Sequence, residues 1–198
     1  MKSFNVSSKE FSKMLNKFIA VVPKKEILPI ISYALLEVDS EKAILKGRAT
    51  NLEVQLDTQC AIALPDADFK FLIEPVEINT MLKKFPEQPV TISYDENKVI
   101  LSVDKKKYEF PTIADFTDFP QTLDKDVKDV RTFEVETEAF FDVFNKAMNT
   151  VGNDELRPIM NGVCVKDHKG QTCVLSTDAH FLSLYNIDVE MPKTAFII

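Results

Sequence analysis

The sequence contains one pattern twice, and this repeat constrains the possible folds more than any other feature. Residues 27–38 read ILPIISYALLEV and residues 156–165 read LRPIMNGVCV, so both place Pro-Ile before an apolar run. About twenty residues further on, RATNLEVQL (48–56) and STDAHFLSL (176–184) each join Thr to Asn or Asp before alternating apolar residues. A helical pattern precedes each Pro-Ile. Such a repeat predicts several copies of one supersecondary unit.

Three segments have the apolar spacing of an amphipathic helix. In the first, Ser7 is predicted to cap the helix and Glu10 to complete a capping box. The second helix is predicted at 78–85, and the third begins at the predicted cap Thr137. Lysines occupy the polar side of the first two helices, whereas the polar side of the third is not basic.

Between the helices the apolar residues alternate, which is typical of strands with one buried face. The segments with this alternation are 31–38, 43–49, 52–58, 59–64, 69–74, 90–95, 99–104 and 107–112. Each helix thus lies between one short strand and a meander of strands. We predict an α+β fold of repeated strand-helix-sheet units, with the helices on one face of antiparallel sheets.

The boundaries of the units follow from this layout. Three units are predicted, at 1–66, 67–120 and 131–198. Residues 121–130 have no apolar period and look like a linker.

Composition narrows the function classes. An apolar fraction of 45% supports a buried core, and no apolar run is long enough for a membrane span or a signal peptide. We therefore expect a soluble, cytoplasmic protein without a membrane partner. A net charge of -7 argues against nucleic acid unless the basic residues gather on one surface. Residues 7–25 do gather five lysines against the single acid Glu10.

Asp178 and His180 are the pair that most resembles a catalytic or metal site. The first copy has Asn51 where the second has Asp178, and both residue types close turns by bonding nearby backbone N–H groups. A structural turn is therefore the favoured interpretation. We predict no catalytic residue, no metal and no cofactor, and hence not an enzyme, because the chain has no nucleophile-base pair, ligand cluster or glycine-rich phosphate loop.

The three cysteines show no metal-binding spacing. A four-residue loop at 167–170 would place Cys164 opposite Cys173, either as two packed thiols or as a cross-strand disulfide.

Several motifs together resemble one family. LPIISYALLEV with ATNLEV, then EFPTIADFTDFP, then NDELRPIMNGV with STDAHFL, resemble the bacterial sliding clamp, the beta subunit of the replicative DNA polymerase III. The resemblance covers the whole chain in the right order. It implies the DNA-clamp fold, in which helices line a ring around duplex DNA and sheets lie outside. Since clamps of this family have three domains of two units each, it also implies that 1–120 is domain 1 and that 131–198 is the first half of domain 2. The chain would be truncated to about one and a half domains.

The resemblance also implies site residues. DNA-binding lysines would contact phosphates without reading sequence, and they are Lys9, Lys13, Lys17, Lys24, Lys25, Lys83 and Lys84. A second DNA contact would lie at Asn153 or Asp154. One wall of a pocket for polymerase and clamp-loader peptides would consist of Met160, Thr177, Ala179, His180, Phe181 and Leu182. Here Ala179 replaces the usual glycine and Phe181 the usual basic residue. The edge for self-association into a ring would consist of Lys105, Lys107 and Tyr108.

Two functions follow from the resemblance. The first is a processivity factor that encircles duplex DNA and tethers the replicative polymerase. The alternative is a clamp-derived protein-interaction module that cannot close a ring or encircle DNA.

Overall fold

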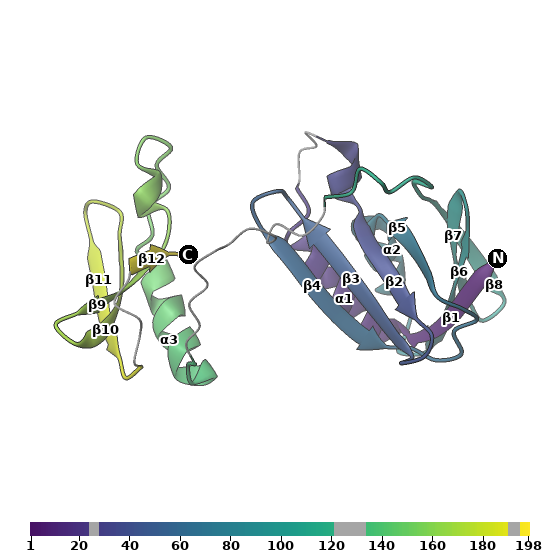
Figure 1. Cartoon of the computed structure of the whole chain (residues 1–198), viewed down its shortest axis with the longest axis horizontal. Coiled ribbons are helices and arrows are strands. Elements are labelled where there is room, and N and C mark those ends of the chain that lie inside the picture. Colours follow the sequence, from purple (N-terminus) through teal and green to yellow (C-terminus); the bar gives the residue numbers. More distant parts are fainter. Residues whose placement is uncertain (24–27, 121–133, 190–194) are drawn as a thin grey trace. The chain divides into compact units, whose positions relative to one another are not determined.

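The computed structural model describes residues 1–23, 28–120, 134–189 and 195–198. It divides into two compact bodies, an N-terminal body (Met1–Lys125) and a C-terminal body (Asp126–Ile198), both drawn in Figure 1. The predicted linker 121–130 lies outside the described residues, as do Lys24 and Lys25.

The N-terminal body has two four-stranded antiparallel sheets and two α-helices, which confirms the predicted fold class. In chain order its elements are β1 (Lys2–Ser7), α1 (Ser8–Ile19), a 3₁₀ turn (Pro29–Ser32), β2 (Ala34–Asp39), β3 (Ile44–Thr50), β4 (Gln55–Ala61), β5 (Phe69–Ile73), α2 (Pro75–Leu82), β6 (Pro89–Asp95), β7 (Lys98–Val103) and β8 (Lys106–Pro111). The strand orders are β4-β3-β2-β5 and β1-β6-β7-β8.

The two repeats of this body exchange their first strands. Strand β1 pairs with β6 of the second repeat, and β5 pairs with β2 of the first. Phe4 of β1 and Phe71 of β5 are both fully buried and lie 6.3 Å apart between ring centroids. The exchange therefore closes one shared core, which neither repeat could bury alone.

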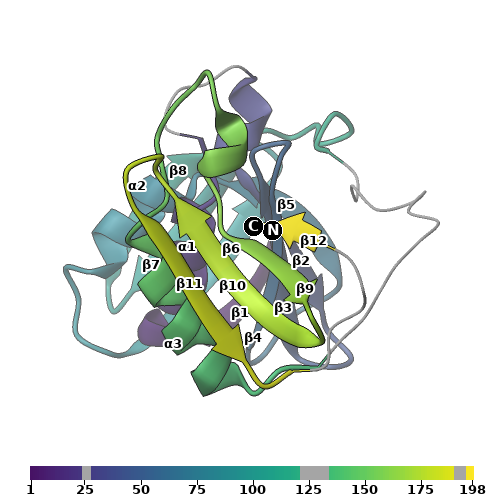
Figure 2. The same ribbon diagram turned by 90° about the vertical axis from the view of Figure 1, so that its left-hand side faces the viewer.

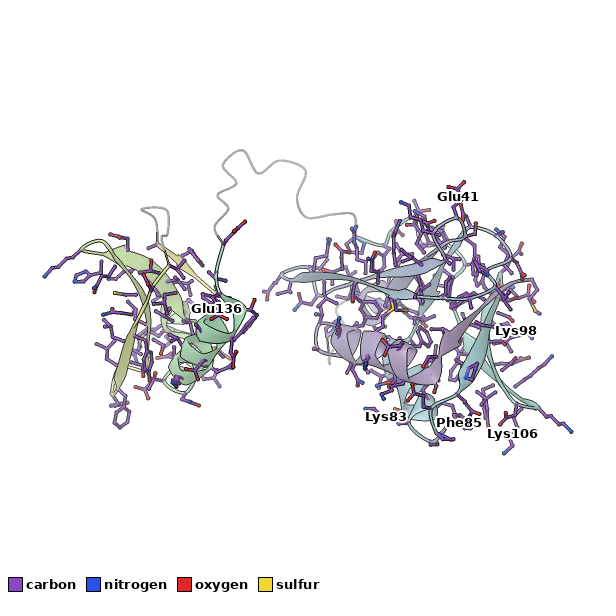
Figure 3. The ribbon with its side chains drawn as sticks, turned by 90° about the horizontal axis from the view of Figure 1, so that it is seen from below. Glu41, Lys83, Phe85, Lys98, Lys106 and Glu136 are labelled. Atoms are coloured by element: carbon purple, nitrogen blue, oxygen red, sulfur yellow. The ribbon has the colours of Figure 1, made fainter. Side chains whose placement is uncertain are left out.

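Helix α1 packs on one face of the sheet β4-β3-β2-β5, and Figure 3 shows it beneath the strands. Gly47 of β3 permits this close approach. A Cβ atom at Gly47 would lie 2.5 Å from Met14 Cε and from Phe18 Cζ, both on α1. The helix buries an apolar stripe against the sheet and leaves its lysines on the opposite side.

The C-terminal body repeats the helix-sheet part of the unit. Its elements are α3 (Thr137–Met148), a 3₁₀ turn (Pro158–Met160), β9 (Cys164–His168), β10 (Gln171–Thr177), β11 (Leu182–Ile187) and β12 (Ala195–Ile197). The strand order is β11-β10-β9-β12, and Figure 2 shows this sheet in front of α3. Strand β12 pairs with β9 as β5 pairs with β2.

The two long helices differ in burial although their sequences predict similar apolar stripes. Helix α1 buries five residues, whereas α3 buries Ala147 alone. Helix α2 lies beside α1, whereas no described helix lies beside α3.

The predictions of helix starts need three corrections. Ser7 is the N-cap of α1, but its side chain makes no capping bond, and Glu10 bonds to Lys13 instead of closing a capping box. Helix α2 spans Pro75–Leu82 rather than 78–85, because Glu74 caps it and Pro75 suits the first turn. Helix α3 is capped by Glu136, not by Thr137, since the Glu136 carboxylate accepts from the two following backbone N–H groups at 138 and 139.

Three predicted strand segments were also wrong. Residues 52–58 and 59–64 are not two strands, because a turn at 51–54 precedes the single strand β4. Segment 31–38 starts too early, since Pro29 opens a 3₁₀ turn.

The predicted pairing of Cys164 with Cys173 was wrong as well. The hairpin has a two-residue turn, with Lys169 and Gly170 at positive φ, so that Lys166 lies opposite Cys173 and Leu175 opposite Cys164. Both cysteines are free thiols.

Candidate nucleic-acid and peptide interfaces

Three predicted DNA-binding lysines lie along the exposed side of α1. Lys9, Lys13 and Lys17 recur every fourth residue, which places them on one side of a helix. Each already has a polar partner. Lys9 Nζ lies 3.2 Å from Glu87 Oε2, Lys13 Nζ lies 2.7 Å from Glu10 Oε1, and Lys17 Nζ lies 3.2 Å from Thr58 Oγ1.

A groove of about 440 Å³ runs between α1 and the C-terminal end of α2. It brings Lys9 and Lys13 together with Lys83, which follows α2 directly. The lining residues are Ser8, Lys9, Ser12, Lys13, Asn16, Leu82, Lys83, Phe85 and Glu87. In Figure 3 the labelled Lys83 lies on the helix side of this body, and Glu41 lies on the opposite side. Lys17 and Lys84 are exposed and lie outside this lining.

Two ion pairs, Lys13–Glu10 and Lys9–Glu87, partly neutralise the lysines on this side of the body. The Lys13 ammonium donates a hydrogen bond to Glu10 and thereby lowers the pKa of that carboxyl. The same bond raises the pKa of Lys13. Glu87 was not predicted as a site residue. It lies 78 residues from Lys9 in a Pro-flanked loop, and no periodic pattern relates the two.

Two of the three corresponding positions on α3 are acidic. Ser8 and Thr137 start α1 and α3, and each precedes a Pro-Ile by 21 residues, at Pro29 and Pro158. By this equivalence Lys9 and Lys13 correspond to the acids Glu138 and Asp142, and Lys17 corresponds to Lys146. Asp142 pairs with Lys146 at 2.7 Å, so α3 offers no free basic row.

The predicted second DNA contact has an internal partner too. Asp154 Oδ2 accepts a hydrogen bond of 2.8 Å from Arg157 Nε, which lowers the pKa of Asp154. The Asn161 side chain accepts from the backbone N–H of Asp154. The polar groups of Asp154 therefore bond within the loop 154–161.

The turn at 177–182 confirms the structural interpretation of Asp178. Asp178 Oδ1 accepts hydrogen bonds from the backbone N–H groups of His180 (2.9 Å) and Phe181 (2.7 Å). Thr177 Oγ1 accepts from the N–H of Ala179, whose φ is 74°.

The first copy has the same side-chain-to-backbone hydrogen bonds from its Thr and Asx residues. Asn51 Oδ1 accepts from Glu53 and Val54, and Thr50 Oγ1 accepts from Leu52 at φ 77°. Asp178 thus holds a backbone conformation, and its pKa is lowered by the N–H groups that it accepts from.

The structure also places Met160 beside this turn. Gly152 N donates a hydrogen bond of 2.8 Å to the Met160 carbonyl oxygen. A Cβ atom on Gly152 would lie 3.3 Å from that oxygen and 3.6 Å from Asp178 Cα. Phe181 and Leu182 are 68% and 67% exposed. Gly152 therefore lies between the backbone of Met160 and the turn that carries the other five predicted peptide-site residues, a proximity that periodicity alone gave no reason to expect.

The predicted ring edge lies on β8. Lys107 and Tyr108 belong to that strand, and Lys105 lies in the turn before it. Strand β8 is at the end of its sheet order, and no described strand pairs with its outer side. The Tyr108 ring packs against Phe85 at 5.8 Å between centroids.

The described residues contain no group of three or more His, Cys, Asp or Glu residues that could hold a metal ion. No helix among them is long and apolar enough to cross a membrane.

Comparison with known proteins adds the following. The family model described as DNA polymerase III beta subunit, N-terminal domain, matches residues 1–124. The beta sliding clamp of Pseudomonas aeruginosa is 23% identical over 96% of this chain and 51% of its own length. That of Rickettsia felis is 22% identical over 93% of this chain and 48% of its own. The chain spans about half the length of the curated relatives that it matches.

Solved structures of the same kind share the fold. The DNA polymerase sliding clamp of Bacillus subtilis covers the whole chain with a TM-score of 0.84 at 14% identity, matching over 53% of its own length. The beta subunit from Thermotoga maritima also gives a TM-score of 0.84, at 21% identity, with the same shares covered.

Proposed function

This chain belongs to the DNA polymerase III beta subunit family, and from that premise we propose that it acts as a DNA sliding clamp. As such it would encircle duplex DNA without sequence preference and hold the replicative polymerase on it. The observation that carries the proposal is the groove between α1 and the end of α2, which joins Lys9, Lys13 and Lys83 on the helix side of the N-terminal body.

The chemistry of that groove suits sliding. Lysine ammonium groups are point charges that contact phosphate oxygens and carry no information about base sequence. Such contacts release counterions and weaken steeply with salt. We propose that Lys17, Lys24, Lys25 and Lys84 extend the same basic surface. Enclosure by a ring, rather than tight binding, would then keep the protein on DNA.

The exposed turn of the C-terminal body supports a second role. We propose that Met160, Thr177, Ala179, His180, Phe181 and Leu182 form one wall of a site for peptides of DNA polymerase and of the clamp loader. Asp178 fixes the turn, and the exposed Phe181 and Leu182 supply apolar surface for a partner side chain. Because Phe181 stands where the family has a basic residue, we expect a preference for apolar over acidic anchors at this position.

The organisation of the whole molecule is proposed on the same basis. Residues 1–120 form the first clamp domain, 121–130 a linker and 131–198 the first half of a second domain. Lys105, Lys107 and Tyr108 on β8 supply an edge for self-association into a ring. The role is non-enzymatic and cytoplasmic, without a cofactor.

One observation favours the alternative function. The α3 positions that correspond to Lys9 and Lys13 carry Glu138 and Asp142, so this face of α3 has acids where α1 has lysines. A clamp-derived module that binds peptides without encircling DNA fits that acidic face.

Retention on DNA separates the two functions. The protein is incubated with clamp loader and ATP on nicked circular duplex DNA, and the DNA is then linearised. A sliding clamp stays on the circle and is lost from the linear form. Binding of a polymerase-derived peptide without any retention on circles would instead support the module.

A further inference from the structure

The pair formed by Lys9 and Glu87 lies inside the groove that the proposed function assigns to phosphate. Lys9 Nζ and Glu87 Oε2 are 3.2 Å apart, and both residues line the groove with Lys13 and Lys83. A phosphate oxygen seeking Lys9 would therefore meet an ammonium that a carboxylate already neutralises.

The backbone on both sides of Glu87 is fixed to the start of α1. Ser8 N donates to the Gln88 carbonyl oxygen (2.9 Å), and Gln88 N donates to Ser8 Oγ (3.0 Å). Ser8 Oγ also bonds to the Pro86 carbonyl oxygen at 3.3 Å. Ser8 is buried. These three bonds hold the loop 86–88 against the helix, so that Glu87 is presented to the next residue of α1, which is Lys9.

The two side chains themselves remain accessible. They are 58% and 60% exposed, so an incoming anion can reach Lys9 and displace the carboxylate. Exposed ion pairs of this kind are weak, worth a few-fold in an equilibrium constant at most. The pair is thus strong enough to compete with one phosphate contact and too weak to block the groove.

We propose that Glu87 is a built-in competitor of DNA phosphate at Lys9, which limits how tightly the groove holds the duplex. This inference rests on the proposed DNA-binding role of the groove. For a protein that must move along DNA, an internal carboxylate that replaces each departing phosphate lowers the cost of breaking the contact.

The experiment measures the affinity for a 30-base-pair duplex of arbitrary sequence by fluorescence anisotropy, at several salt concentrations. Glu87→Gln keeps the size of the side chain and removes its charge. We expect it to raise the affinity about two- to fivefold, which is the range that an exposed ion pair supplies. Glu41→Gln is the control, because it makes the same change of net charge on the side of the body opposite Lys83 (Figure 3).

A double variant tests whether the gain acts through Lys9. In a Lys9→Ala background, Glu87→Gln should raise the affinity less than it does in the wild type, and only the weaker interaction of Glu87 with Lys13 remains. Equal effects of Glu87→Gln and Glu41→Gln in the wild-type background would overturn the inference while leaving the DNA-binding groove intact. Failure of the groove assignment looks different, since Lys9→Ala and Lys13→Ala would then leave the affinity and its salt dependence unchanged.

Discussion

Ser12 Oγ donates a hydrogen bond of 2.7 Å to Asn79 Oδ1 and so joins α1 directly to α2. The amide group of Asn79 donates in turn to Asn16 Oδ1 at 2.8 Å. Asn79 is only 1% exposed, yet both polar ends of its side chain have partners. The two repeats of the N-terminal body are therefore joined through their helices as well as through their exchanged strands, and this link holds the groove that contains Lys9 and Lys83.

Replacement of Asn79 by Ala should destabilise the N-terminal body. It removes the acceptor of the half-buried Ser12 and the donor to the exposed Asn16, and the loss of these two hydrogen bonds costs about 1–3 kcal/mol. Urea denaturation followed by circular dichroism measures the change in the free energy of unfolding. Glu77→Gln, at an exposed position of the same helix, should stay within about 0.5 kcal/mol of the wild type. Similar values for the two variants would mean that the link between the helices contributes nothing to stability.

Phe11 and Phe140 occupy the same position in α1 and α3, the fourth residue of each helix. Phe11 is fully buried, whereas Phe140 is half-buried, and no described helix lies beside α3. We expect Phe11→Ala to cost the N-terminal body about 3–5 kcal/mol. Phe140→Ala should cost the C-terminal body clearly less. Hydrogen exchange of amides in each body, measured by NMR, reports the two effects separately, and equal losses would contradict the difference in burial.

Phe11 and Phe140 illustrate which features of the fold the sequence predicts and which it does not. Apolar spacing predicted both helices and placed both rings on the apolar side, because period alone decides which residues share a face. It could not predict which helix has a neighbour. The exchange of β1 and β5 was equally hidden, since alternation marks a strand but not its partner. Helix α2 was misplaced because the cap is Glu74, a residue type that seldom takes that position.

The candidate site was likewise only partly predictable from local sequence patterns. The spacing of four residues placed Lys9, Lys13 and Lys17 on one exposed side, and the Thr-Asx repeat predicted the turn at Asp178. Contacts between distant segments left no local signal. Glu87 beside Lys9 is one such contact, and the approach of Met160 to the turn at Asp178 is another, which only the family resemblance suggested.

Ala179 should be replaceable by glycine with a gain in stability. Its φ of 74° is a left-handed conformation that costs a residue with a Cβ atom about 1–2 kcal/mol and glycine very little. Part of that gain is offset by the greater freedom of glycine in the unfolded chain. We expect Ala179→Gly to raise the free energy of unfolding of the C-terminal body by about 0.5–1 kcal/mol in chemical denaturation. Leu52→Gly should act in the same direction in the first copy, at φ 77°.

The control is an Ala→Gly substitution inside a helix, where glycine is expected to lower stability. Ala139 lies in α3 near its N-terminus, and Ala139→Gly should lower stability, by up to about 1 kcal/mol. A loss of stability at both alanines would show that the conformation of Ala179 carries no strain.

Asp178 should make the turn of the C-terminal body sensitive to acid. Backbone N–H groups of Phe181 and His180 lower its pKa in the folded protein. A lowered folded-state pKa stabilises the fold above the unfolded value of about 3.9, and this stability is lost as the pH falls from about 4 through the folded value. Asp178→Asn keeps the accepting oxygen, as Asn51 does in the first copy, but cannot titrate. The wild type should therefore be more stable than Asp178→Asn at pH 7, and this difference in stability should be smaller at pH 3. The measurement is denaturation at each pH, followed by the NMR signals of the His180 and Phe181 amides. The reciprocal change Asn51→Asp should introduce the same acid sensitivity at the Glu53 and Val54 amides. If the difference in stability between wild type and Asp178→Asn stays constant with pH, the Asp178 carboxylate does not hold the turn.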